Sequence, residues 1–310
     1  MAALLSPEAA GLGLRLVAGR RGAVREILRS RVQRPGLALA GHTGYIQYGR
    51  VQIVGGSELS YLRKLLPDQR ARALARVCRK RMSCLVVTKG KQPPPELKRA
   101  AEARGIPLLY TRMESTVFIK QLQAFLDERL APREQQHAVM VDVFGLGVLI
   151  AGESGIGKSE CALELVDRGH RMVADDVVEI KRLGEWLYGS APELTRHHME
   201  LRGLGILNVK DLYGVSAIRL SKRIELVVKL ERWKAGRAYD RLGLRGERVT
   251  LLGVRVPRVR MPVAPGRNLA LLVEVASRNQ LLKERGFDAA RRLAERVDAL
   301  VESGEDGERS

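Results

Sequence analysis

GESGIGKS, at Gly152 to Ser159, fits the pattern G-x-x-x-x-G-K-[ST] of a phosphate-binding P-loop. Glycines in such a loop let backbone N–H groups approach phosphate oxygens, and the N-terminus of the following helix adds partial positive charge. Lys158 would reach the β- and γ-phosphates of a nucleotide, and the Ser159 hydroxyl would bind Mg²⁺. The motif therefore predicts that the chain binds a nucleoside triphosphate. The residues of this predicted site are Gly152, Glu153, Ser154, Gly155, Ile156, Gly157, Lys158 and Ser159.

The residues on either side of the loop have the pattern that P-loop binding requires. The apolar run Val148 to Ala151 predicts a buried strand, and Glu160 to Arg168 predicts a helix closed by Gly169. The next apolar piece, Met172 to Ala174, predicts a second strand. We therefore expect a strand–loop–helix–strand unit, and this context argues against a chance match by a Gly-rich turn.

Two carboxylates, Asp175 and Asp176, directly follow the second expected strand. Ligands of parallel α/β units lie beyond the carboxyl ends of the strands, so this pair is expected beside the phosphates. An acidic residue there can hold Mg²⁺ or accept the proton of an attacking hydroxyl. The pair follows the P-loop much sooner than the acidic motif of most P-loop proteins, which indicates an atypical nucleotide-binding fold. A solvated Asp-Asp turn is the structural alternative.

Three histidines and a second Gly-rich segment lie around this unit. His137 comes before the strand that leads to the loop, and a lone histidine there is more often an exposed surface residue. His197 and His198, followed by Glu200, look like metal ligands, but adjacent side chains on a strand point apart and chelate poorly. The segment ELRGLGILN, from Glu200 to Asn208, is either a loop that closes over phosphates or an ordinary Gly-rich turn.

Strand-like and helix-like segments alternate from Leu37 to Leu130, within a first domain expected over residues 1–130. This alternation predicts a small α/β domain with a largely parallel sheet, in which we find no residues that indicate a particular chemistry. Helices are expected from Glu58, from Pro95 to Arg104 and from Ser115, whose hydroxyl would cap the last helix. The expected strands are Val51 to Val54, Cys84 to Thr88 and Ile106 to Tyr110.

A polar, proline-containing segment over residues 131–136 predicts a linker to a second domain, which covers residues 137–310. Strand-like pieces dominate this domain, and helices are expected after the P-loop and at about Phe287 to Val301. The expected strands include Ala138 to Phe144, Val148 to Ala151, Ile224 to Leu230, Val249 to Val256 and Leu269 to Val275.

Composition sets the class of protein. A chain of 310 residues is long enough for two domains, and its 45% hydrophobic residues exclude a disordered chain. No apolar run approaches the roughly 20 residues of a membrane span, and we expect no signal peptide. Because Cys78, Cys84 and Cys161 form no C-x-x-C pair, we expect neither disulfides nor structural zinc. Unpaired cysteines fit a reducing compartment, so we expect a cytoplasmic protein. The net charge of +19 favours polyanionic partners, but scattered cations and only 4% aromatic residues select no particular partner.

Together these segments resemble the HPr kinase/phosphorylase family, bacterial enzymes that act on a serine of the phosphocarrier protein HPr. A P-loop alone is common, whereas a P-loop followed by RGHRMVADD and ELRGLGILNV is specific. Weaker similarity extends through PGLALAGH (Pro35 to His42) and KGKQPPPELKRAAEARGIPLL (Lys89 to Leu109). The closely matching segments are GLGVLIAGESGIGKSECALELVDRGHRMVADD (Gly145 to Asp176), MELRGLGILNVKDLYG (Met199 to Gly214), YDRLGL (Tyr239 to Leu244) and PVAPGRNLALLVEVA (Pro262 to Ala276).

The resemblance implies how the nucleotide and its metal are bound. Gly152 to Ser159 would bind the ATP phosphates, and Lys158 would stabilise the charge of the transferring group. Ser159 and Glu200 would be the Mg²⁺ ligands.

The resemblance also implies the residues of the proton transfer. Asp176 would remove the seryl proton during kinase action. It would return that proton during phosphorolysis, in which inorganic phosphate attacks phosphoserine and yields pyrophosphate. His137 and Arg241 match the remaining active-site positions of the family, which reverses the preference for an inactive His137 that its position alone suggests.

The implied architecture is a two-domain subunit. A small N-terminal α/β domain of unclear role would precede a C-terminal P-loop kinase domain, with a mixed sheet and a phosphoenolpyruvate-carboxykinase-like core. The subunits would form a homohexamer. One departure concerns the segment that in this family usually reads P-V-basic-P-G-R, because Ala264 occupies the basic position here. That segment is linked to dephosphorylation, so the departure bears on phosphorolysis and not on kinase activity.

Two other functions remain open at this point. A small-molecule kinase on the same core would phosphorylate free metabolites and ignore an intact acceptor protein. A nucleotide-gated regulator that binds nucleic acid would show an affinity for DNA or RNA that falls steeply with salt, without phosphotransfer. No helix-turn-helix, zinc-finger or RNA-binding signature in the sequence supports this last function.

Overall fold

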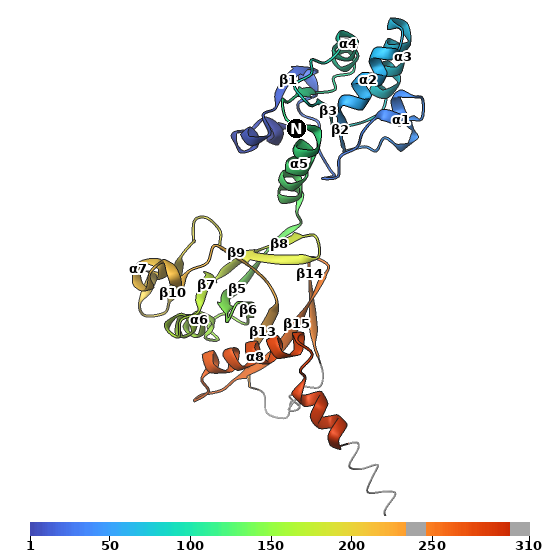
Figure 1. Cartoon of the computed structure of the whole chain (residues 1–310). Coiled ribbons are helices and arrows are strands. Elements are labelled where there is room, and N and C mark those ends of the chain that lie inside the picture. The colour runs from blue at the N-terminus through green and yellow to red at the C-terminus, as the bar shows by residue number, and fades with distance from the viewer. Residues whose placement is uncertain (234–245, 298–310) are drawn as a thin grey trace, which may run out of the picture. The chain divides into compact units, whose positions relative to one another are not determined.

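The computed structural model describes residues 1–233 and 246–297 (Figure 1). It contains two compact units, Met1–Ala131 and Pro132–Ser310. Residues 133–136, which the sequence predicts to be linker, belong to the first strand of the second unit, β5 (Arg133–Val143). These polar residues are strand because their backbone pairs with a neighbouring strand while their side chains reach solvent.

The first unit, all of whose residues 1–131 are described, contains a four-stranded sheet in the order β1-β4-β3-β2. Strands β2, β3 and β4 are parallel, and β1 runs antiparallel to β4 at one edge. The small α/β domain with a largely parallel sheet is therefore confirmed. Its strands are β1 (Arg15–Ala18), β2 (Val51–Val54), β3 (Cys84–Val87) and β4 (Leu108–Tyr110).

Helices cover both faces of this sheet because its central strands are apolar on both sides. Leu85 and Val87 of β3 point into a core shared with α2, α3 and α4, whereas Val86 points into the opposite core, shared with α5. The α-helices are α1 (Gly36–Leu39), α2 (Gly56–Lys64), α3 (Pro67–Cys78), α4 (Pro95–Ala103) and α5 (Ser115–Leu130), and the 3₁₀ helices are η1 (Ala2–Leu5), η2 (Pro7–Leu12), η3 (Arg20–Gly22) and η4 (Thr43–Tyr45).

The second unit is built on a mixed sheet whose described strands follow the order β12-β9-β8-β5-β6-β13-β15-β14, with β7 beside β5. Strands β6, β13 and β15 are parallel, and β5 runs antiparallel to β6. The first half of β5 pairs with β8 and its second half with β7. The strands after β5 are β6 (Leu146–Ala151), β7 (Arg171–Ala174), β8 (Val177–Leu183), β9 (Trp186–Ser190), β12 (Ser221–Arg223), β13 (Leu226–Arg232), β14 (Arg248–Leu251) and β15 (Val254–Val263).

A hairpin and helices complete the described part of this unit (Figure 1). Helices α6 and α8 share one core with β6 and β13, in which Leu165 of α6 and Val273 of α8 are fully buried. This core holds α6 directly behind the loop that joins it to β6. The hairpin is β10 (His198–Leu201) with β11 (Gly205–Asn208), the helices are α6 (Lys158–Asp167), α7 (Val209–Tyr213), η5 (Val215–Ala217) and α8 (Leu269–Glu284), and residues 289–297 are also helical.

Two strand predictions for this unit are wrong. Residues 269–275, predicted as a strand, are the first half of α8, which Asn268 caps by accepting a hydrogen bond from the backbone N–H of Leu271 at 2.7 Å. Residues 249–256, predicted as one strand, form a hairpin instead. Leu252 and Gly253 turn the chain with φ of 45° and 78°, both in the left-handed region that two-residue hairpin turns use.

The predicted cap of α5 is also wrong. Ser115 is the first residue of the helix, and Glu114 holds the capping position without a side-chain bond to the helix. The Ser115 hydroxyl lies 2.6 Å from the Thr88 hydroxyl, and both side chains are buried. The serine therefore links the helix start to the end of β3 rather than capping its own backbone.

Candidate active site

The P-loop joins the end of β6 at Ala151 to the start of α6 at Lys158. Gly155 and Gly157 have φ of 74° and 98°, in the region that only glycine adopts without strain. Gly152 is required for lack of space and not for its φ, because a Cβ there would lie 3.0 Å from the carbonyl oxygen of Leu230 on β13. The buried Ile156 packs into the core while residues 153–155 are exposed. The loop is thus a glycine cradle open at its apex and tied to the sheet at its base.

The ammonium group of Lys158 is held at the mouth of this cradle. Its Nζ donates hydrogen bonds to the carbonyl oxygens of Gly152 at 3.1 Å and Glu153 at 3.0 Å. The Glu153 carboxylate lies 3.6 Å from the Arg232 guanidinium, an ion pair on the exposed surface. The positive charge of Lys158 therefore lies where the backbone N–H groups of the loop and the N-terminus of α6 add positive potential.

Asp175 connects the P-loop helix to the hairpin β10–β11. Its Oδ1 accepts a hydrogen bond from the Ser159 hydroxyl at 2.8 Å, and its Oδ2 accepts one from the backbone N–H of Glu200 at 3.2 Å. The side chain is buried, and burial raises the pKa of this carboxyl above its ordinary value, an effect that the two hydrogen bonds partly offset. Ser159 and Asp175 thus place a hydroxyl and a carboxylate oxygen side by side. Oxygen atoms are the metal ligands that hard divalent cations prefer.

Asp176 points away from its neighbour, into solvent. Its φ of 61° turns the chain between β7 and β8, and its carbonyl oxygen accepts a hydrogen bond from the backbone N–H of Ala138 at 3.0 Å. The Asp176 carboxylate lies 3.7 Å from Nδ1 of His137, and these side chains are 72% and 83% exposed. Both groups are accessible from solvent, and this acid–imidazole pair is the second part of the candidate site.

The predicted site residues are brought together only in part. Glu200 lies on an exposed position of β10, joined to Asp175 through its backbone. Nδ1 of His198 lies 2.9 Å from the carbonyl oxygen of Arg196. Residues 1–233 and 246–297 contain no group of three His, Cys, Asp or Glu side chains that could hold a metal. Arg241, predicted as an active-site residue, lies outside the described residues.

Two residues to which the sequence assigned no individual role lie at the P-loop. Asp175, and not Asp176, contacts Ser159. Arg202 lies against the loop apex, because a Cβ on Gly155 would be 2.8 Å from its Nη1. Asp175 belongs to the acidic doublet and Arg202 to the Gly-rich segment from Glu200 to Asn208, so the sequence marks both regions, but only the folded chain shows which acid of the doublet faces the loop.

Comparison with known proteins supplies the family. Residues 5–126 match the model described as HPr Serine kinase N terminus, and residues 128–297 match the HPr Serine kinase C-terminal domain. No helix in the described parts of the chain is long and apolar enough to cross a membrane.

Similar proteins cover nearly the whole chain. The HPr kinase/phosphorylase of Geobacter sulfurreducens is 49% identical over 96% of this chain and 94% of its own. That of Caldicellulosiruptor bescii is 46% identical over 92% of both chains. The solved structure of the Hpr(Ser) kinase/phosphatase from Coxiella burnetii is 36% identical, covers 52% of this chain and 98% of its own, and gives a TM-score of 0.48. With both family models matched and relatives this similar over nearly its full length, the chain belongs to the HPr kinase/phosphorylase family.

Proposed function

We propose that this chain transfers the γ-phosphoryl group of ATP to a serine of the phosphocarrier protein HPr, and that it also catalyses phosphorolysis of the phosphoserine by inorganic phosphate. Membership of the family supports the acceptor. The observation that carries the chemistry is the hydrogen bond between Ser159 and Asp175, because it places Asp175, the residue directly before the proposed base Asp176, beside the P-loop helix. The C-terminal unit is then the catalytic domain, and the role of the N-terminal unit is a separate question.

The nucleotide would lie with its phosphates in the cradle of residues 152–159. Backbone N–H groups of the loop would bind the phosphate oxygens, and Lys158 would stabilise the charge that moves during transfer. Arg202 would add a second cation, because its guanidinium lies against Gly155 at the loop apex. A guanidinium in this position matches phosphate geometry with two parallel donors.

Mg²⁺ fits the oxygen donors beside the loop. The Ser159 hydroxyl and the Glu200 carboxylate are the ligands that the family resemblance implies, and we add Asp175, whose carboxylate contacts Ser159. When bound, Mg²⁺ would neutralise charge on the β- and γ-phosphates and orient them.

Asp175→Asn is expected to raise the Mg²⁺ concentration for half-maximal kinase activity by about 10- to 100-fold, because a neutral amide replaces an anionic ligand. Burial raises the pKa of the Asp175 carboxyl, and only its ionised form binds a cation well. The Mg²⁺ affinity of the wild type should therefore weaken as the pH falls, and this dependence should flatten in the variant. Kinase assays across Mg²⁺ concentration and pH measure both effects. Asp167→Asn at the exposed end of α6 is the matched control, and an unchanged Mg²⁺ requirement in Asp175→Asn would refute the ligand assignment.

Asp176 is the proposed proton acceptor. The seryl oxygen of HPr attacks the γ-phosphorus, the bond from that phosphorus to the bridging oxygen of ADP breaks, and the seryl proton passes to the Asp176 carboxylate. In phosphorolysis an oxygen of inorganic phosphate attacks the phosphorus of phosphoserine. The seryl oxygen leaves with the proton from Asp176, and pyrophosphate forms. His137, 3.7 Å from this carboxylate, would orient it, and Arg241 is proposed to complete the site.

Ala264→Lys is expected to raise the rate of phosphorolysis by about tenfold, the effect of one added charge-assisted hydrogen bond to phosphate. Residue 264 begins the turn after β15, in which the backbone N–H of Arg267 donates to the Ala264 carbonyl oxygen at 3.3 Å. Pyrophosphate release from phosphoserine-HPr measures the change. Ala289→Lys, on an exposed helical position, controls for the added charge, and equal gains in the two variants would show that position 264 has no specific role.

Assembly and compartment follow as parts of the same proposal. A homo-oligomer, a hexamer by resemblance, is supported by apolar side chains that remain 70–74% exposed on and beside the hairpin β10–β11, at Leu204, Ile206 and Val215.

A cytoplasmic location is supported by Cys78, Cys84 and Cys161, which are free thiols in the folded chain.

The test of the function uses purified HPr, ATP and Mg²⁺ with this chain. Mass spectrometry should find one phosphoserine on HPr, and addition of inorganic phosphate should remove it with release of pyrophosphate. Phosphorylation of small metabolites with no label on intact HPr would instead indicate a small-molecule kinase.

A further inference from the structure

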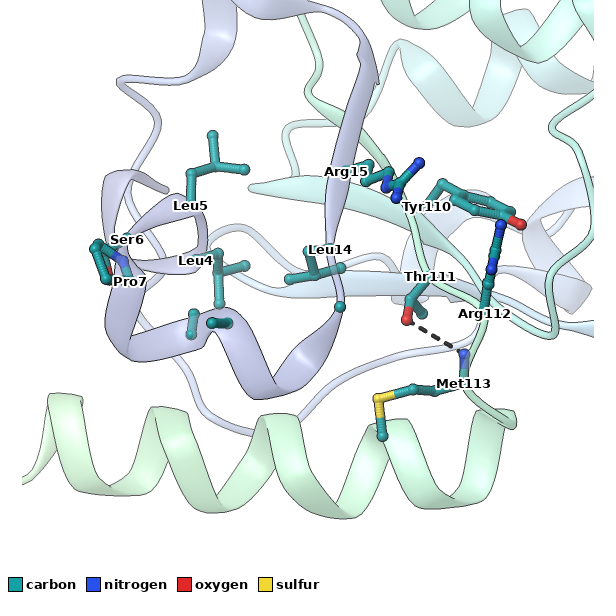
Figure 2. Close-up of a pocket in the computed structure, with 13 residues that line it drawn as sticks. Leu4, Leu5, Ser6, Pro7, Leu14, Arg15, Tyr110, Thr111, Arg112 and Met113 are labelled. Carbon is teal, nitrogen blue, oxygen red and sulfur yellow. Dashed lines mark hydrogen bonds between the residues drawn. The ribbon is translucent and has the colours of Figure 1, made fainter.

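A cavity of about 560 Å³ opens in the N-terminal unit, away from the residues of the proposed kinase site. The turns η1 and η2 form one wall, and residues 110–113 together with the start of β1 form the other (Figure 2). The cavity lies at the carboxyl end of β4, the edge at which α/β sheets place their ligands. Its volume falls in the range of small-molecule pockets, roughly 300–1,000 Å³.

The inner part of the cavity is apolar. Figure 2 shows Leu4 and Leu14 pointing toward one another from opposite sides, with Met113 below them. Leu4 is fully buried, and Leu14 and Met113 pack against the same core of the unit. An apolar group that entered here would pack against an existing hydrophobic core, and removing its surface from water would favour binding.

Three polar side chains gather on the opposite rim. Arg15 and Tyr110 are directly opposite one another in the antiparallel pair β1–β4, so their side chains share one face of the sheet. Arg112 follows two residues after Tyr110, and its side chain also lines the cavity. The side chains of Arg15, Tyr110 and Arg112 therefore lie on the same side of the cavity.

No negative charge compensates these arginines. None of the residues that line the cavity is acidic, and neither guanidinium has a hydrogen bond or ion pair with any residue of the described ranges 1–233 and 246–297. The acids nearest in sequence are engaged elsewhere: Glu8 pairs with Arg129 of α5, and Glu114 pairs with Lys89 at 2.8 Å. The mouth thus keeps a local excess of positive charge.

The walls are held together before any ligand binds. The Thr111 hydroxyl is buried, donates to the carbonyl oxygen of Leu12 at 2.9 Å and accepts from the backbone N–H of Met113 at 3.3 Å. These bonds join η2 to the end of β4, and the pair of Glu8 with Arg129 joins η2 to α5. A preformed pocket spares a ligand the entropic cost of ordering its site.

We propose that this cavity binds a small amphipathic organic anion. A carboxylate or phosphate head would accept hydrogen bonds from Arg15 and Arg112, and an apolar group would lie against the partly exposed side chains of Leu5, Leu14 and Met113. The planar fork of a guanidinium matches both kinds of head group. An inorganic anion leaves the apolar interior uncovered, and a neutral apolar molecule leaves the guanidinium groups without a partner, so neither uses both halves of the cavity.

The test is a ligand-observed NMR titration of the full chain. The probes are hexanoate and hexyl phosphate, which carry both parts, acetate and inorganic phosphate, which carry the head alone, and hexan-1-ol, which carries the apolar part alone. Inorganic phosphate and hexyl phosphate are also expected to bind at the P-loop, so each titration is run with the P-loop saturated by ATP. Under this condition, either or both six-carbon anions should bind about tenfold or more tightly than acetate, inorganic phosphate or hexan-1-ol, and the tighter of the two identifies the preferred head group.

Variants locate the binding. The double variant Arg15→Gln/Arg112→Gln should weaken the six-carbon anions by about tenfold or more, whereas Arg72→Gln/Arg99→Gln, an exposed pair in α3 and α4 with the same loss of charge, should not. Ala10→Phe should fill the mouth and abolish binding, and its unfolding transition checks that the unit still folds. The proposal fails if no six-carbon anion binds, if inorganic phosphate binds as tightly, or if the two double variants behave alike. It also fails if a folded Ala10→Phe protein binds as the wild type does.

Discussion

Lys158→Ala is expected to lower kcat for phosphate transfer to HPr by about 10²- to 10³-fold, the usual effect of removing one donor that stabilises transition-state charge. The side chain ends at the mouth of the cradle, with Nζ 3.0–3.1 Å from two loop carbonyl oxygens. An alanine cannot place a charge there. The fold should persist, because the hydrogen bonds lost contribute only about 1 kcal/mol each and lie at a partly exposed position.

Initial rates with HPr and ATP, together with a thermal unfolding curve, measure both parts of this expectation. Lys120→Ala on the exposed side of α5 removes the same charge from the other unit and should leave kcat unchanged. Equal turnover of Lys158→Ala and wild type would remove Lys158 from the mechanism. A large fall in the unfolding midpoint would assign it a structural role instead.

The local unit around the P-loop was predictable because its chemistry fixes its backbone. Gly155 and Gly157 have the positive φ that a phosphate loop demands, and the apolar run before them is the strand β6. The helix begins at Lys158, two residues before the predicted start, so its N-terminus lies at the end of the loop, where a P-loop would bind phosphate.

The apolar run at residues 269–275 shows the limit of such patterns. A short run of this kind fits a buried strand and a buried helix equally well, and its period does not separate them. The outcome depends on Asn268, which caps α8, and on the core that α8 shares with β6 and β13. That core is a long-range property, so no local pattern contains it.

The same limit applies to the acidic doublet. Its position beside the P-loop follows from sequence, but the division of labour between its two members does not. Asp175 faces Ser159, and Asp176 faces His137. This division depends on the φ of Asp176 and on the register of β5 against β8, in which His137 lies opposite Val177. The register brings together residues far apart in the chain, and only tertiary structure defines it.

Asp176→Asn is expected to lower kcat by about 10²- to 10⁴-fold in both directions of the reaction, because general acid–base catalysis contributes that much and the Asp176 carboxyl is proposed to serve both directions. Asparagine is the informative replacement. It adopts the left-handed backbone that Asp176 has at φ of 61°, so the turn between β7 and β8 should be kept. Alanine would add backbone strain to the chemical loss and confuse the two effects.

The distinction between the two acids gives this experiment its sharpest control. Asp176→Asn should retain the wild-type Mg²⁺ requirement and nucleotide affinity while losing turnover, whereas Asp175→Asn should shift the Mg²⁺ requirement. Glu185→Gln, an exposed carboxylate in the turn between β8 and β9, should change neither. Rapid-quench measurement of the first turnover separates the chemical step from product release. If Asp176→Asn transfers phosphate at the wild-type rate in that first turnover, another group accepts the seryl proton. The exposed pair of Asp176 and His137 would then take no part in the reaction.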